Sequence, residues 1–165
     1  MDNVSVSMQI AIALSGDNSD IAGSELGIAK DTPNLTRGET YSNGSGSGEC
    51  DVIFHAVLAI TTLDEVDFNG VVLKDAFGEG LAITKLKGLF IKNLTGGALT
   101  IGDAANPMPI FGTPIGDTLV LADNASFLYL APADGLTIGA GSGELEFVHA
   151  EGGAQSVEII AVGAR

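Results

Sequence analysis

The chain has 165 residues, of which 45% are hydrophobic and 17% charged, so it is long enough to form one domain around a buried core. Seven basic and 21 acidic side chains give a net charge of −14 at pH 7. Because phosphate backbones and anionic lipid headgroups repel such a surface, we expect no nucleic-acid partner and no membrane partner.

Glycine and cysteine usage narrow the class of protein further. Glycine occurs 23 times without a Gly-X-Y period, and tryptophan is absent, which excludes collagen and favours short strands joined by glycine turns. Cys50 is the one cysteine in the sequence, so no internal disulfide forms. A partner of this acidic chain should be basic or should bind through apolar contacts.

The N-terminal stretch alternates apolar residues with small or polar ones, which is typical of a half-buried strand. The apolar positions, which we assign as a candidate interface strand, are Val4, Val6, Met8, Ile10, Ile12 and Leu14. Asp2 stands where a signal peptide carries basic residues, and no run approaches about 18 apolar residues. We therefore expect a soluble protein without a cleaved leader or a transmembrane helix.

Residues 15–49 are rich in Gly, Asn, Asp, Ser and Thr, have no sustained periodicity, and end in the Gly/Ser-rich stretch 42–48. The sequence thus predicts an N-terminal arm over residues 1–50, made of one long strand and an irregular connection, followed by a body over residues 51–165. A connection of this length is normally functional, disordered or held by a partner, which favours an assembly over an isolated monomer.

The body reads as a succession of short strands separated by turn-forming clusters about ten residues apart. The expected strands are 51–62, 81–93, 98–102, 118–122, 126–131, 136–139, 144–150 and 156–163. This pattern predicts an all-β, antiparallel jelly roll or β-sandwich. Lys85 and Lys87 interrupt an apolar face and indicate a bulge or an exposed section. Residues 62–77 are ambiguous between a helical turn and extended structure.

Catalytic and metal-binding patterns are missing from the sequence. No nucleophile elbow, phosphate loop or dinucleotide fingerprint occurs, and the two histidines, His55 and His149, stand alone in strands. We interpret both histidines as structural and Cys50 as a buried small residue. The sequence predicts neither an enzyme nor a bound cofactor or metal.

Acidic side chains also form pairs that hydrolases or calcium sites use. The candidates are Asp17 with Asp20, the group Asp64, Glu65 and Asp67, and Glu144 with Glu146. Because the last pair alternates outward along one strand and calcium-loop spacing fails after Asp17, we interpret these residues as solvated surface. A structural or binding protein is left by elimination.

The order of several segments resembles the small jelly-roll virion proteins of tailed bacteriophages, which include capsid decoration (cement) proteins. The resemblance covers about residues 44–163. It rests on DAFG at 75–78, KLKGLFIKNLTGGALTIGD at 85–103, FLYLAPADG at 127–135, GELEFVHAEG at 143–152 and VEIIAVG at 157–163.

This resemblance implies a homotrimer, made in the host cytoplasm, that binds the major capsid protein on the outside of the virion. It further implies that the protein stabilises the capsid by clamping neighbouring coat subunits. A head-fibre base or tail-associated module with a receptor- or glycan-binding surface is the alternative. A cupin-type enzyme shares the fold but needs a histidine pair and a glutamate that this sequence lacks.

Overall fold

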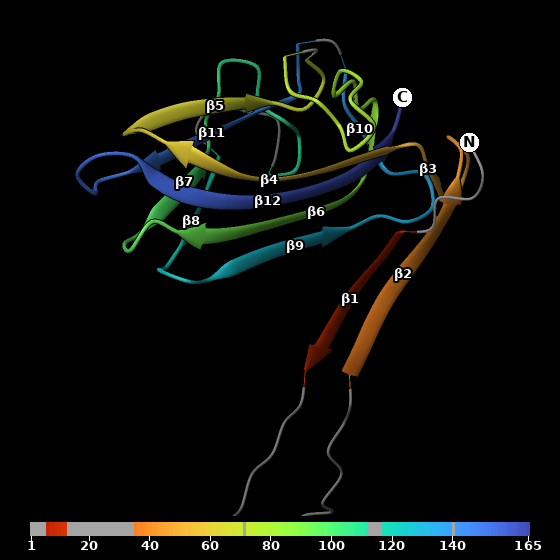
Figure 1. Ribbon diagram of the computed structural model, residues 1–165, viewed down its shortest axis with the longest axis horizontal. Helices are drawn as coiled ribbons and strands as arrows, with labels where there is room; N and C mark the ends of the chain where they lie inside the picture. The colour runs from red at the N-terminus through yellow and green to blue at the C-terminus, as the bar shows by residue number, and fades with distance from the viewer. Residues whose placement is uncertain (1–5, 13–34, 71, 112–116, 140) are drawn as a thin grey trace, which may run out of the picture.

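The structure is a computed structural model that describes residues 6–12, 35–70, 72–111, 117–139 and 141–165, with side chains described from residue 41. Its described elements are all strands (Figure 1). They are β1 (Val6–Ile12), β2 (Leu35–Asn43), β3 (Glu49–Cys50), β4 (Val52–Ile60), β5 (Leu63–Asp67), β6 (Lys85–Leu94), β7 (Leu99–Gly102), β8 (Thr118–Leu121), β9 (Ser126–Leu130), β10 (Leu136–Thr137), β11 (Glu144–His149) and β12 (Gln155–Ala164). No helix of membrane-spanning length and hydropathy occurs among the described residues.

Two antiparallel sheets pack face to face and form the body (Figure 1). The five-stranded sheet has the order β10-β6-β12-β4, with β9 also paired to β6. The four-stranded sheet has the order β5-β11-β7-β8. A third sheet, β1-β2-β3, begins at one end of the body and projects away from it as a hairpin (Figure 1). The predicted all-β antiparallel sandwich is confirmed.

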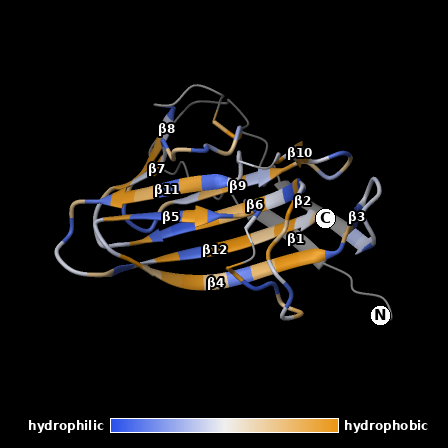
Figure 2. Cartoon of the chain, turned by 90° about the horizontal axis from the view of Figure 1, so that it is seen from above, coloured by the Kyte–Doolittle hydropathy of each residue, from blue (hydrophilic) through white to orange (hydrophobic). Residues whose placement is uncertain are grey.

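The core lies between the two large sheets and follows from strand alternation. In β4, Val52, Phe54 and Ile60 are buried whereas His55 is exposed, as a period of two requires. Phe54 meets Phe68 edge to face, with ring centroids 6.5 Å apart. Hydrophobic residues accordingly concentrate along strands such as β4, whereas most connecting loops are hydrophilic (Figure 2).

The bulge that the two lysines indicate is present in β6. The register with β12 runs from Val162 opposite Gly88 to Gly163 opposite Leu86, so Lys87 has no counterpart. Leu86 and Lys87 are both buried although they are consecutive. The bulge therefore keeps Leu86 in the core and places Lys87 on the outer face of the five-stranded sheet.

Glycine is required where the backbones crowd beside this bulge. A Cβ on Gly163 would lie 2.6 Å from the carbonyl oxygen of Lys85 and 2.6 Å from Cγ2 of Ile83. Gly135 has a φ of +72°, and a Cβ there would lie 2.9 Å from the carbonyl oxygen of Leu86. Larger residues at either position would push the neighbouring strands apart.

Three segments differ from the sequence-based expectation. Part of the predicted irregular connection forms β2, because its backbone pairs with β1 although its sequence lacks apolar alternation. Leu81 and Ile83 are buried, yet the strand begins only at Lys85. The ambiguous region 62–77 forms β5 followed by turns, and its described residues contain no helix.

Candidate functional site

The N-terminal hairpin, formed by β1 and β2, belongs to neither of the two large sheets of the sandwich. β1 pairs antiparallel with β2, from Val6 opposite Tyr41 to Ile12 opposite Leu35, and lies at the edge of its sheet. Figure 1 shows the two strands leaving the body side by side and extending beyond it. Within the described residues β1 pairs with β2 alone, so one edge of β1 is open to another strand.

Four of the six predicted interface residues lie in β1 and the other two do not fall in the described part of the chain. Val6, Met8, Ile10 and Ile12 occupy alternate positions and therefore one face of the strand. Val4 and Leu14 lie outside the described residues.

The residues of β2 that share this face follow from the register, because directly opposed residues of an antiparallel pair lie on one side. They are Leu35, Arg37, Glu39 and Tyr41. Tyr41 is the member of this face nearest the body. The face is apolar along β1, whereas β2 adds Arg37 and Glu39 to it.

Tyr41 anchors the hairpin on the outer face of the five-stranded sheet. Its side chain is 1% exposed, and its hydroxyl donates to the carbonyl oxygen of Lys87 at 3.0 Å. Tyr41, Cys50 and Val162 form a second buried cluster. The half-buried side chains packed against this cluster are Ile53, Phe90, Leu128 and Leu130.

Lys87 fixes the Gly/Ser-rich loop that follows β2. Its buried ammonium donates to the carbonyl oxygen of Gly46 and, at 2.5 Å, to that of Glu49. The Glu49 carboxylate in turn accepts from the Gly46 amide at 2.8 Å, and the Gly48 amide donates to the carbonyl of Pro132 at 3.1 Å. A stretch with the composition of a flexible linker is thereby held against the body.

Cys50 is buried beside this anchor, as predicted. Burial raises the pKa of its thiol, the Lys87 ammonium opposes that rise, and Asp51 adds to it. Because the net effect is a raised pKa, the thiol is protonated at neutral pH and is a poor nucleophile.

The two histidines lie in different surroundings. His149 is buried in β11, with Nε2 3.1 Å from the carbonyl oxygen of Ile60 and Nδ1 without a partner among the described residues. His55 is exposed on β4, with Nε2 3.1 Å from Oε1 of Glu158. The His149 contact joins the two large sheets, whereas the His55 contact lies within the five-stranded sheet.

The acidic candidates serve local hydrogen bonds. Asp64 accepts from the amide and the hydroxyl of Thr61, and Asp67 accepts from the amide of Asn69. Glu144 accepts from the amide and side chain of Asn106. Asp17 and Asp20 lie outside the described residues. In the described part of the chain, no group of three or more potential ligands is placed to hold a metal ion.

Sequence reasoning missed the two residues that position the hairpin, Tyr41 and Lys87. The lysine pair signalled the bulge, but nothing in the local pattern connects Lys87 to a loop 38 residues away. Tyr41 stands in a polar segment without periodicity, where a lone aromatic residue was the available signal.

Comparison of the chain with protein-family models, with curated proteins and with solved structures finds no match. The geometry of the hairpin and the sequence resemblance therefore carry the functional argument.

Proposed function

We propose that this protein is a structural subunit that joins a larger assembly through its N-terminal hairpin, and that the assembly is the outer surface of a phage capsid. In this role it binds the major capsid protein, associates with copies of itself as a trimer, and clamps neighbouring coat subunits. The observation that carries the proposal is a hairpin that leaves the sandwich with an open edge on β1 and with apolar residues at alternate positions along that strand.

A two-stranded hairpin is marginal by itself in water, so burial of the apolar residues of β1 by a neighbour stabilises it. The open edge of β1 offers main-chain groups to a strand of another subunit. The fixed base of the hairpin supports this role, because Tyr41 and Lys87 hold its origin while its far end extends beyond the body.

The capsid as partner rests on the resemblance to phage virion proteins. The strand orders support the jelly-roll part of that resemblance: β4, β12, β6 and β9 lie in one sheet, and β5, β11, β7 and β8 in the other. The net charge of −14 suits a protein that faces away from packaged DNA.

Deletion of residues 1–15 tests the proposal. We expect the truncated protein to co-sediment with capsids at least about tenfold less well and to lose oligomer mass, because β1 is removed. The melting temperature of the body should change by less than about 4 °C, since the anchored base and both large sheets remain.

Point variants test whether capsid binding needs the apolar residues of β1 or only the presence of this strand. Met8→Glu and Ile10→Glu place charge on the apolar face of β1 and should weaken capsid binding, whereas Gln9→Glu places the same charge on the opposite face and should bind normally.

Unchanged capsid occupancy and oligomer mass in the truncated protein contradict the proposal. A few copies per particle, in place of hundreds, would indicate a tail or fibre position.

A further inference from the structure

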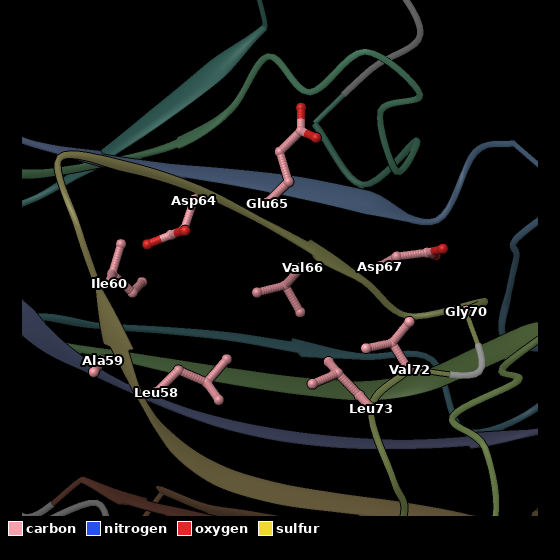
Figure 3. Close-up of a pocket in the computed structure, with 10 residues that line it drawn as sticks. All are labelled: Leu58, Ala59, Ile60, Asp64, Glu65, Val66, Asp67, Gly70, Val72 and Leu73. Atoms are coloured by element: carbon pink, nitrogen blue, oxygen red, sulfur yellow. The ribbon is translucent and has the colours of Figure 1, made fainter.

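A groove of about 350 Å³ lies between β4 and β5, far along the chain from the hairpin (Figure 3). Consecutive residues line both walls, from Leu58 to Ile60 on β4 and from Asp64 to Asp67 on β5. Because consecutive side chains of a strand point to opposite faces, such walls are strand edges and not sheet faces. The groove is the gap where one side of the sandwich opens.

The inside of this groove is mainly apolar, and Asp64, which lies on the Val66 side of β5, is hydrogen-bonded to Thr61. Ile60 and Val66 form buried wall positions, and Leu58 and Leu73 are half-buried beside them. Figure 3 shows Leu58, Val66 and Leu73 in the space between the two strands. Val72, which also lines the groove, is 89% exposed, so a large apolar side chain lies open to solvent at its mouth.

β5 has a free edge along this groove. It is the terminal strand of its sheet and, among the described residues, pairs with β11 alone. Its residues alternate between the groove, where Val66 lies, and the outer face of the sheet, where Glu65 and Asp67 are exposed. Figure 3 shows Glu65 on the opposite side of β5 from Val66.

The outer face beside this edge is strongly negative. Glu65 lies directly opposite Glu146 in the β5–β11 register. Burial, Asp103 and Glu65 together raise the pKa of Glu146, which reflects the concentration of like charge there. No lysine or arginine is among the described residues that line the groove.

We propose that the free edge of β5 binds an extended segment of another protein in which apolar and basic residues alternate. The segment adds a strand to the four-stranded sheet through main-chain hydrogen bonds. Its apolar side chains enter the groove beside Val66, Leu58 and Leu73, and its lysines or arginines lie over Glu65 and Asp67.

Charge favours such a partner over the other occupants of this edge. The segment 13–34 of the chain carries Asp17, Asp20, Glu25 and Asp31 against Lys30, so the acidic edge repels it. A second copy of the chain brings a further net charge of −14. The binding surface is separate from the hairpin and stands whether or not the hairpin holds an assembly.

The probe is a fluorescent seven-residue peptide of alternating lysine and valine, titrated against the full chain in low salt and followed by anisotropy. We expect saturable binding, with protection of β5 amides from hydrogen exchange. Glu65→Lys and Val72→Lys should each weaken binding about three- to tenfold, since one reverses a facing charge and the other charges the mouth of the groove.

Matched controls distinguish strand addition at this edge from general attraction to an acidic protein. Asp134→Lys is the same charge reversal at an exposed site, and Val120→Lys charges the other edge strand of the same sheet. Both should bind within about twofold of the unmodified chain. Two further peptides are N-methylated, one at every lysine amide and the other at every valine amide. One of the two should bind at least about tenfold less tightly, because only alternate residues of an added strand donate to the sheet.

Equal binding by the groove variants and the control variants overturns the proposal, as does binding of both N-methylated peptides as tightly as the unmodified one. Absence of saturable binding below about 1 mM also overturns it. A third outcome is that the unmodified chain does not bind the peptide and that Val72→Lys lowers its oligomer mass. The groove is then a contact between copies of the chain, and the proposal is wrong.

Discussion

Lys87 shows how one residue fixes the relation between the hairpin and the body. The bulge in β6 turns its side chain out of the core, and the ammonium then meets two carbonyl oxygens of the loop at 46–49. Hydrogen bonds to a charged group are stronger than neutral ones, and the buried Lys87 ammonium needs these two acceptors. The side chain thus acts as a clamp on a glycine-rich loop.

We expect Lys87→Met to lower the free energy of unfolding by about 1–3 kcal/mol, because both carbonyls lose their donor while the aliphatic packing is kept. The loop at 42–49 should also become a site of limited proteolysis. Urea denaturation and mass spectrometry of the digest measure both effects. Lys74→Met, at an exposed lysine, is the control and should change stability by less than about 0.5 kcal/mol.

Asp75 is a fully buried carboxylate with a complete set of donors. It accepts from the amides of Phe77 and Glu79 at 2.9 Å each and from the Arg165 guanidinium at 2.5 Å. Burial pushes its pKa upward, but the hydrogen bonds from Arg165, Glu79 and Phe77 outweigh burial, and the pKa is lowered. The ionised form is therefore the one that stabilises the fold.

This lowered pKa predicts a specific acid sensitivity. The folded pKa lies below the unfolded value of about 3.9, so the stabilisation is complete above that value and is lost as the pH falls through the folded pKa. Asp75→Asn should cost about 1.5–3 kcal/mol at about pH 7 and progressively less towards about pH 2. Denaturant titrations across this range measure the difference from the unmodified chain.

Asp134→Asn is the matched control for this titration, because Asp134 is exposed. At about pH 7 this variant should change the free energy of unfolding by less than about 0.5 kcal/mol. A constant deficit of Asp75→Asn across the whole pH range would contradict the linkage.

At the scale of elements, the pairing of β5 with β11 places like charges side by side. Glu65 opposes Glu146, and Glu144 opposes Asp67. Opposed like charges destabilise a strand pair, so this part of the sheet is less stable than its apolar residues alone would make it. A basic partner bound at this surface would offset the repulsion between these carboxylates.

Glu146→Gln should therefore stabilise the chain by about 0.2–1 kcal/mol at about pH 7. The pKa of Glu146 is raised by burial, Asp103 and Glu65, so its ionised form opposes folding above the folded pKa. The gain should vanish once the pH is below the unfolded value of about 4.3. Unfolding titrations measure the gain, and Glu79→Gln, at an exposed glutamate outside the β5–β11 pair, is the control and should not stabilise the chain at about pH 7.

At the scale of the whole molecule, a net charge of −14 opposes association of identical copies. Apolar and strand-pairing contacts must then overcome repulsion that salt screens. We expect the oligomer to tighten as sodium chloride rises from about 20 mM to about 300 mM, measured by sedimentation velocity. An oligomer that weakens over this range is held by charge pairs, which would contradict the expectation.

The sequence by itself determined the local features that depend on alternation and composition. The period of two in residues 52–60 and in most later segments predicted the strands of an antiparallel sandwich. The lysine pair in residues 81–93 indicated a bulge or an exposed section, of which the bulge is present. Cys50 was predicted as buried from its type and position. These features follow from which side of a strand a residue occupies, and that is a local property.

The tertiary structure decided everything that depends on which strands meet. β2 forms because its backbone pairs with β1, so a segment without apolar alternation is a strand. Lys87 reaches the loop at 46–49 because two sheets bring distant residues together. The groove exists because β4 and β5 end their sheets on one side of the sandwich. Strand pairing joins residues far apart in sequence, and the local pattern of a strand does not specify its neighbour.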